Sequence, residues 1–419
     1  VITWWAPSWN ESTGSLSRLL RGRRPGEVTI PPICDPERID DADATTALRE
    51  WESAGGPALE ESVIATVACP PARLLRKDLG VRHFHRAIDT TWRRTSYSGL
   101  IRQAESTGVG SEPEVTGLDD EYDEHSDELG APDTTAAGED VPSPMAALPM
   151  GARFGSLVHA VLETADPVAD DLAAELRIHI DHHSKWWPLA AEFSAADVAA
   201  ALVPLHDTPL GPLAGGLTLR QIGLNDRLRE MDFEFPLGAG DLGNRSDIRL
   251  ADVGELLHRH LPGDDLLASY AGRLSGGGLG AQPLRGYLSG SIDAVLRIPA
   301  ESGHRYLVAD YKTNWLGETE TPLTAADYGP ARMAEAMLHS DYPLQALLYS
   351  VVVHRFLRWR QPGYDPDHHL GGVLYLFLRG MCGKHTPVLD GHPSGVFSWR
   401  PPSALVVEMS DLLDGRRCS

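Results

Sequence analysis

The stretch from Gly286 to Gly317 decides the fold of this chain; it reads GYLSGSIDAVLRIPAESGHRYLVADYKTNWLG. Its first part is rich in aliphatic and β-branched residues, PAESGH interrupts that run, and RYLVADYKT resumes it, which predicts two strands joined by a turn. Side chains alternate between the two faces of a strand, so Asp310 and Lys312 should point the same way and Tyr311 the opposite way. Pairing of the two strands would bring Asp293 beside Asp310.

Two carboxylates and one ammonium at the end of an apolar strand pair indicate a metal site with a cation beside it. Carboxylate oxygens are the ligands that Mg2+ prefers. An Asp-x-Lys in a strand is nevertheless common by chance, and it is usually a solvated face with a weak ion pair. Here the apolar run Leu307–Ala309 precedes Asp310, so the carboxylate lies where a buried strand emerges. This context favours the metal site.

Three motifs in this order resemble the C-terminal nuclease domain of the RecB family, within the PD-(D/E)xK nuclease superfamily. They are G-x-I-D at 290–293, D-Y-K-T-N-W-L-G at 310–317 and Q-x-x-x-Y at 345–349. The resemblance implies a mixed α/β fold, with a restriction-endonuclease-like core in which helices flank a central mixed sheet. It covers residues 151–400 well and the first hundred residues loosely.

Two further ligands follow from the resemblance. The pattern G-S-x-x-H-x-x-x-E from Gly155 is similar to the family's first nuclease motif, which makes His159 a metal ligand. From the residues alone, a lone His on an amphipathic helix more often packs than binds a metal. The stretch 228–237 alternates as a strand with one acidic face, which by itself is also an ordinary edge strand. The resemblance places a third acidic ligand there, at Glu230, with Asp232 as the alternative.

The resemblance therefore implies a complete set of site residues. The catalytic set is Lys312, Asp310, Asp293 and Glu230; the metal ligands are His159, Asp293, Asp310, Glu230 and the carbonyl of Tyr311; and Gln345, Tyr349 and Arg355 lie near the DNA. The expected cofactor is Mg2+, with Mn2+ as the alternative that suits an imidazole ligand and Ca2+ as an inhibitory analogue. All of these roles are expectations from the family.

Length and composition limit the classes of protein to which this chain can belong. A chain of 419 residues with 42% hydrophobic content is long enough for two or three domains. Its four cysteines show no C-x-x-C spacing, which favours a reducing compartment. No run of eighteen apolar residues and no signal pattern occur, so we expect a soluble, cytoplasmic protein without membrane contact. The chain begins with Val, which indicates a fragment of something longer.

Charge and motifs divide the chain into three segments. Residues 1–104 resemble, weakly, the end of a helicase motor domain and the start of a linker, and no G-x-x-x-x-G-K-[ST] phosphate loop occurs in the chain. Residues 105–149 read as an acidic, disordered linker, with an acidic interaction tail or DNA mimic as the alternative. Residues 150–419 form the predicted nuclease domain.

The net charge of −22 is unusual for an enzyme that acts on DNA, but much of it is local. Residues 105–140 hold thirteen acidic side chains and no Lys or Arg, which leaves −22 + 13 = −9 for the rest. Because phosphate binding follows the local potential, the charge weakens a nucleic-acid partner without excluding one.

The expected function is a divalent-metal-dependent deoxyribonuclease of the exodeoxyribonuclease V type. By resemblance it would act with RecC- and RecD-like subunits on double-strand DNA ends, in recombinational repair. Two alternatives stay open: a DNA-binding pseudo-nuclease, against which the intact Asp293, Asp310 and Lys312 argue, and a nuclease of the AddA type.

Overall fold

The computed structural model describes residues 17–18, 41–60, 92–105, 138, 141–238, 248–301, 303–318 and 321–416. The chain divides into two compact units, Val1–Arg86 and Ala87–Ser419, and each is described by itself. In the first unit the structure describes the helix α2 (Asp41–Ser53). Most of the acidic stretch predicted to be a linker, 106–137, lies outside the described residues.

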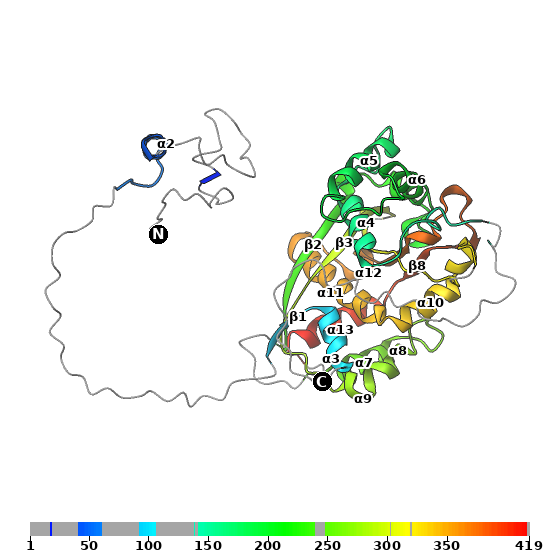
Figure 1. Cartoon of the computed structure of the whole chain (residues 1–419). Helices are drawn as coiled ribbons and strands as arrows, with labels where there is room; N and C mark the ends of the chain where they lie inside the picture. The colour runs from blue at the N-terminus through cyan, green and yellow to red at the C-terminus, as the bar shows by residue number, and fades with distance from the viewer. Residues whose placement is uncertain are drawn as a thin grey trace, which may run out of the picture. The chain divides into compact units, whose positions relative to one another are not determined.

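A six-stranded mixed sheet runs through the second unit (Figure 1). Its strands are β1 (Arg93–Thr95), β2 (Arg227–Leu237), β3 (Gly286–Ala300), β4 (Gly303–Lys312), β5 (Leu370–Phe377) and β8 (Val396–Trp399). The order is β1-β3-β4-β5-β8, with β2 paired to β3. The contacts β1–β3 and β4–β5 are parallel and the others antiparallel. The predicted strand–turn–strand stretch is confirmed as the antiparallel pair of β3 and β4.

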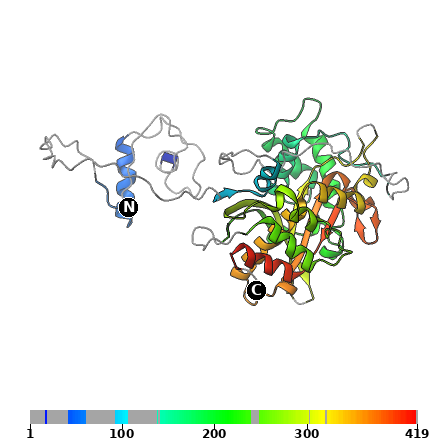
Figure 2. The same cartoon turned by 90° about the horizontal axis from the view of Figure 1, so that it is seen from below.

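Helices lie on both faces of the sheet (Figure 2). Each face carries its own hydrophobic core. One face packs against α3 (Tyr97–Glu105), α7 (Leu250–His260), α8 (Tyr270–Ser275), α10 (Pro330–His339), α11 (Tyr342–Arg360) and α13 (Ser403–Leu413). The other packs against α4 (Ala152–Thr164), α5 (Leu172–His183) and α6 (Ala195–His206). Strand β4 contributes to both cores because successive side chains alternate between the faces. The predicted class, a mixed α/β fold with a central mixed sheet between helices, is confirmed.

Short elements complete the second unit. They are α9 (Gly277–Gly280), α12 (Pro366–His369), the paired strands β6 (Val388–Leu389) and β7 (His392–Pro393), and the 3-10 turns η2 (Pro212–Ala214), η3 (Leu219–Gln221), η4 (Leu224–Asp226), η5 (Ala325–Tyr328), η6 (Leu378–Gly380) and η7 (Gly383–His385). Among the described residues, no helix combines the length and the apolar character needed to cross a membrane.

The compact unit begins earlier than the predicted residue 150. Residues 141–149 pack against it, and Met145 is fully buried in the core that faces α4. The fully buried Arg379 holds this segment, because its guanidinium donates hydrogen bonds to the carbonyls of Met145 (2.8 Å), Leu148 (3.3 Å) and Pro149. The charge and turn residues of this segment indicated a linker. They do not reveal its contact with Arg379, because that residue lies more than 200 positions further along the chain.

The first predicted boundary, after residue 104, also differs from the edge of the unit. Strand β1 pairs in parallel with the first residues of β3, where Thr95 lies opposite Leu288. Leu100 on α3 is buried in the core on the α11 side. The stretch 93–105 is therefore part of the same folded unit as the sheet.

Candidate active site at the ends of β3 and β4

The two aspartates lie where β3 and β4 separate. The antiparallel pairing ends at Ala294 and Ala309, and Asp293 and Asp310 are the next residue on each strand. Oδ2 of Asp293 accepts a hydrogen bond of 2.6 Å from the backbone N–H of Tyr311. The strand pairing therefore brings Asp293 to the end of β4, as the sequence predicted.

Lys312 lies on the same face of β4 as Asp310, and its Nζ is 3.0 Å from Oδ2 of that carboxylate. Both side chains are nearly buried, with 8% and 4% exposed. Nζ also lies over the ring of Tyr342, 4.3 Å from its centroid. Tyr311 points to the opposite face and joins the core under α4, which confirms the predicted alternation.

Burial and neighbouring charges move the pKa values of this group apart. Burial raises the pKa of Asp310 to about 7, since the opposing effect of Lys312 is only partial and Asp293 adds repulsion. Burial acts to raise the pKa of Asp293 as well, but His159 and the Tyr311 N–H outweigh it and lower that pKa. Burial by itself would lower the pKa of Lys312, but the negative charge of Asp310 has the larger effect. The pKa of Lys312 is therefore raised, and the amine stays protonated.

His159 is placed against the same carboxylates by α4. Its Nδ1 lies 3.3 Å from Oδ1 of Asp293, and its ring meets the ring of Tyr311 edge-on at 5.9 Å. The helix forms because Phe154 and Val158 belong to an apolar stripe that is buried on the sheet. The structure thus brings His159 to the aspartates, and its role as a metal ligand stays a prediction.

Glu230 breaks the regular strand that the alternating sequence predicted. Pairing of β2 with β3 skips the position where Glu230 faces Asp293, and Glu230 has φ of 46°, a left-handed value that is rare for residues other than Gly. The face pattern of β3 changes at the same point, because Ile292 and Ala294 lie in different cores. Of the two acidic candidates, Glu230 is therefore the one opposite Asp293, and Asp232 pairs with Ser291 further along.

The local charge around Glu230 is strongly negative. Partial burial, with repulsion from Asp293 and Glu163, raises the pKa of Glu230 to about 7. Its side chain is still exposed, so water screens part of that repulsion. Glu163 is the last residue of the predicted first motif, and its carbonyl accepts a hydrogen bond of 2.5 Å from Arg229. The motif pattern assigned a role to His159 and none to Glu163.

Gln345 and Tyr349 are buried on α11 and do not form a surface for DNA in this structure. They are 1% and 3% exposed. Nε2 of Gln345 donates to the hydroxyl of Tyr349 at 3.1 Å, and Oε1 of Gln345 accepts from the hydroxyl of Tyr375 at 2.9 Å. Tyr375 in turn stacks on Tyr342, whose ring contacts Lys312. The pair therefore lies behind the ammonium, and its predicted contact with DNA has no support in this geometry.

Arg355, the third predicted DNA contact, is engaged within the fold. Its guanidinium donates to the carbonyl of Ser410 and to Oδ1 of Asp414, both at 2.7 Å, and it lies over the ring of Phe235. These contacts join α11 to α13 and β2. The structure thus gives Arg355 a packing role, while Arg358 at the same end of α11 is exposed.

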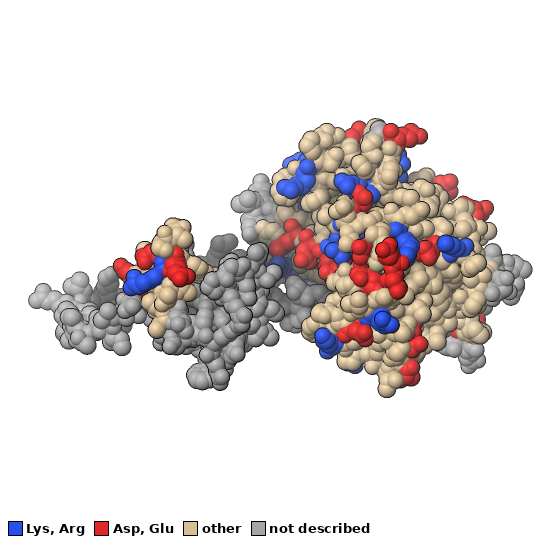
Figure 3. All heavy atoms as spheres, turned by 90° about the horizontal axis from the view of Figure 1, so that it is seen from above, with Lys and Arg blue, Asp and Glu red and all other residues tan. Residues whose placement is uncertain are grey.

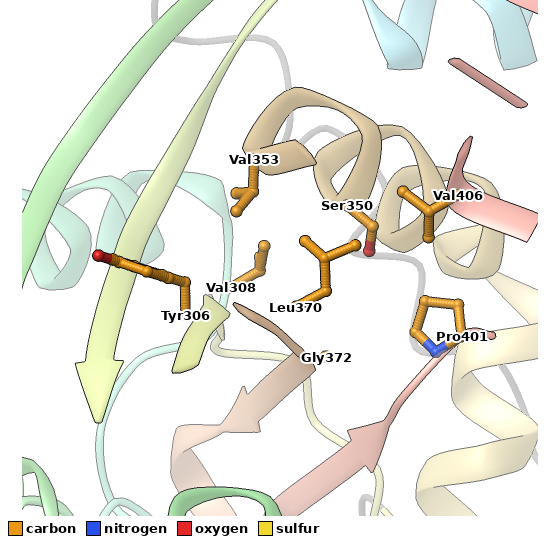
Figure 4. A pocket seen from close by; sticks show the side chains of 8 residues that line it. All are labelled: Tyr306, Val308, Ser350, Val353, Leu370, Gly372, Pro401 and Val406. Carbon is orange, nitrogen blue, oxygen red and sulfur yellow. The ribbon is translucent and has the colours of Figure 1, made fainter. Parts of the chain in front are cut away.

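Among the described residues, neither the surface charge in Figure 3 nor the cavity in Figure 4 marks another site. On the face shown in Figure 3, Lys and Arg are interspersed with Asp and Glu, and acidic residues gather near its middle. A cavity of about 10 Å³, room for about one water, lies between β4, β5, α11 and α13 (Figure 4). It is lined by Tyr306, Val308, Ser350, Val353, Leu370, Gly372, Pro401 and Val406. It lies earlier along β4 than Asp310, and the hydroxyl of Ser350 already donates to a backbone carbonyl.

The carboxylates and the imidazole at this site are groups that bind divalent cations, although their side chains do not converge on one point in this structure. Among the described residues, no three His, Cys, Asp or Glu side chains converge closely enough to hold a metal ion. Asp310 Oδ2 is buried, faces only the Lys312 ammonium and lacks a hydrogen bond of regular geometry. Asp293, Asp310 and Glu230 supply carboxylate oxygens, the ligands that a hard cation prefers, and repulsion from Asp293 contributes to the raised pKa of the other two. The residues therefore fit such an ion in chemistry.

The fold and the site together define an α/β domain of the nuclease-like class, with two acids and a lysine at strand ends. No protein-family model matches the chain. It is 64% identical, over 99% of its length, to the RecBCD enzyme subunit RecB of Mycolicibacterium smegmatis, and 60% identical, over its whole length, to that of Mycobacterium tuberculosis H37Rv. It is also 28% identical, over 81% of its length, to the RecBCD enzyme subunit RecB of Escherichia coli K12.

The resemblance to the RecB family is thus confirmed along nearly the entire chain. The chain spans about 37% of the length of the two mycobacterial relatives and matches their C-terminal part. It corresponds to the part of RecB that carries the nuclease domain.

Proposed function

We propose that this chain hydrolyses phosphodiester bonds in DNA with the help of a divalent metal ion. The observation that carries the proposal is the convergence of Asp293 and Asp310 at the end of the β3–β4 ladder, with the Lys312 ammonium 3.0 Å from Asp310. Hydrolysis of a phosphodiester needs an activated water and stabilisation of a more negative transition state. Carboxylates that hold a cation, beside a fixed ammonium, supply both requirements.

The residues divide between holding the cofactor and acting on the substrate. Asp293, Asp310, Glu230, His159 and the carbonyl of Tyr311 would hold Mg2+ or Mn2+, as oxygen ligands and one imidazole. The bound ion would lower the pKa of a water and neutralise a phosphate oxygen. Lys312 would orient that water or stabilise the charge that develops on the phosphate. Gln345 and Tyr349 would support this arrangement from within the fold.

The activity of the whole protein belongs to the same proposal. The relatives are named as subunits of the RecBCD enzyme. We infer that this chain is the nuclease part of a helicase–nuclease that works with RecC- and RecD-like subunits on double-strand DNA ends. A DNA-binding pseudo-nuclease is the second candidate, and the intact Asp293, Asp310 and Lys312 disfavour it. An AddA-type nuclease is disfavoured because the relatives found are named as RecB proteins.

The test is cleavage of linear DNA by the purified chain, with Mg2+ and then with EDTA. Asp310→Asn should abolish cleavage, because it removes a negative ligand at nearly constant size. Asp226→Asn is a matched control, since Asp226 forms an exposed ion pair with Arg297 on another part of the sheet. Cleavage that survives in Asp310→Asn or in EDTA would contradict the proposal. A folded chain that binds DNA without cutting it would support the pseudo-nuclease.

A further inference from the structure

We propose that Tyr342 positions the Lys312 ammonium through the face of its aromatic ring, and holds that charge in place independently of Asp310. The inference rests on the proposed function and deepens it, because it concerns how the charge is kept at the reacting group. The ring comes from the first residue of α11, three residues before Gln345. The sequence motifs did not include Tyr342.

The contact geometry supports a cation–π interaction. Nζ of Lys312 lies 4.3 Å from the centroid of the Tyr342 ring and 5.7 Å from that of Tyr375. The two rings are stacked on each other, with centroids 5.6 Å apart and planes 25° apart. A cation over an aromatic face is attracted by the negative face of the ring, and the attraction grows when water is excluded, as it is around this nearly buried lysine.

The Tyr342 ring gives the Lys312 ammonium a second contact besides Asp310. In the proposed reaction the carboxylate of Asp310 also serves a metal ion, which weakens its hold on Lys312. The aromatic face does not compete with that ion for a carboxylate oxygen. The N–H donors of the ammonium that point away from the ring stay available for Asp310, a water or a phosphate oxygen. Tyr342 therefore keeps the charge in position whichever partner Asp310 has.

The backbone before Tyr342 is fixed by a buried acid. Asp341 is 3% exposed and has φ of 57°, a left-handed value that a residue other than Gly seldom adopts. Its carboxylate accepts a hydrogen bond of 2.9 Å from the hydroxyl of Tyr270 and one of 2.6 Å from Arg273. These bonds join α8 to the start of α11, and they hold Tyr342 at the site.

The ring of Tyr375, which stacks on that of Tyr342, links it to the Q-x-x-x-Y pair. The hydroxyl of Tyr375 donates to Oε1 of Gln345 at 2.9 Å and lies 3.3 Å from the carbonyl of Tyr342. Gln345 is itself bonded to Tyr349. The pair thus acts on Lys312 through two stacked rings, which explains how two buried side chains influence the site without touching a substrate.

The contact can be measured without DNA or metal, because the chain has four lysines. Isotope labelling of Lys gives a small set of side-chain NMR signals, and the ring face should shift those of Lys312 upfield. Tyr342→Leu should remove the shift and Tyr342→Phe should keep it. Tyr364→Leu is the control, since Tyr364 contacts His354 near the far end of α11. An unshifted Lys312 signal in the parent, or one unchanged in Tyr342→Leu, would overturn the inference.

A second measurement asks whether the contact matters for the reaction. Phenylalanines of increasing fluorination at position 342 weaken the negative ring face at nearly constant shape. The single-turnover rate should fall stepwise, by about thirtyfold at the end of the series, with Mn2+ affinity and KM for DNA unchanged. The same series at Phe356, on the same helix, should have no effect. A flat series at Tyr342 rejects the positioning role. No cleavage in the parent, with the Lys312 signal shifted, rejects the nuclease proposal instead.

Discussion

Nζ of Lys312 lies 3.0 Å from Oδ2 of Asp310, in a pair of side chains that are both nearly buried. A buried ion pair is tolerated because each charge compensates the other, and removing one partner leaves a costly uncompensated charge. In the proposed reaction, Asp310 serves two cations at once.

Asp310→Ala should abolish cleavage and also destabilise the fold. The substitution removes a proposed ligand and leaves the Lys312 ammonium buried without its carboxylate, which costs about 3–5 kcal/mol of unfolding free energy. Asp310→Ala with Lys312→Met should recover part of that stability without recovering cleavage. Urea unfolding and a cleavage assay on the three proteins measure both effects. Full cleavage by Asp310→Ala would show that the site is elsewhere.

Lys312→Ala should act on the chemical step and leave metal capture near normal. An ammonium cannot bind a cation, and its removal should leave Mn2+ affinity unchanged or slightly improved. The cleavage rate should fall about 100-fold or more, as for the loss of one stabiliser of a transition state. Lys312→Arg should rescue little, because the guanidinium is larger and presents its donors differently. Calorimetric Mn2+ binding and single-turnover cleavage separate the two steps; lost Mn2+ binding would assign Lys312 a structural role.

Exchanging the metal ion should show that binding of a cation and cleavage of DNA can be separated. EDTA should stop cleavage, and Mg2+ or Mn2+ should restore it, because the proposed ligands are mostly carboxylate oxygens. Ca2+ should compete with Mn2+ for the site without supporting cleavage, since its larger and looser coordination suits the transition state less well. Calorimetric displacement of Mn2+ by Ca2+, beside cleavage in the same buffers, checks this. Rapid cleavage with Ca2+ alone would refute it.

Arg379→Met should release residues 141–149 and lower stability. The fully buried guanidinium donates hydrogen bonds to the carbonyls of Thr313, Met145, Leu148 and Pro149. Its loss would leave these carbonyl oxygens without that donor. Each stranded group costs about 1–3 kcal/mol. Hydrogen exchange should show faster exchange in this segment, with α13 as the internal reference. Equal protection in the variant and the parent would exclude the anchor.

His206 should make stability fall in mild acid. Burial lowers the pKa of His206 to about 4, while an unfolded chain has a pKa near 6.5. Between these values the unfolded state binds a proton that the folded state does not, so the contribution is complete above pH 6.5 and is lost as pH falls to 4. The loss is about 3 kcal/mol. Chemical unfolding of the parent and His206→Gln should show a flatter pH dependence in the variant; parallel curves would exclude this linkage.

Much of the site could be predicted from local pattern. The interrupted apolar run fixed a strand pair, and the two-residue period placed Asp310 and Lys312 on one face and Tyr311 on the other. The apolar stripe of α4 predicted the helix that carries His159. These features depend on residues that are close in sequence, so the spacing alone carries the information.

Other features needed the tertiary structure. The left-handed break at Glu230 lies within a strictly alternating strand, and it becomes visible only where β2 meets Asp293 on β3. The sequence placed Gln345 and Tyr349 on a helix, but only the packing of α11 buries them behind Lys312.

The sequence by itself determined a strand pair with two acids and a lysine at the strand ends, because the strand period is set by the local backbone; the mixed α/β class followed from the family resemblance. The tertiary structure decided which groups surround that lysine. Tyr342 and Tyr375 come from a helix and a strand 30 and 63 residues after Lys312, and Arg379 reaches back to Met145 across 234 residues. Such contacts depend on how separate elements pack, and no local spacing records them.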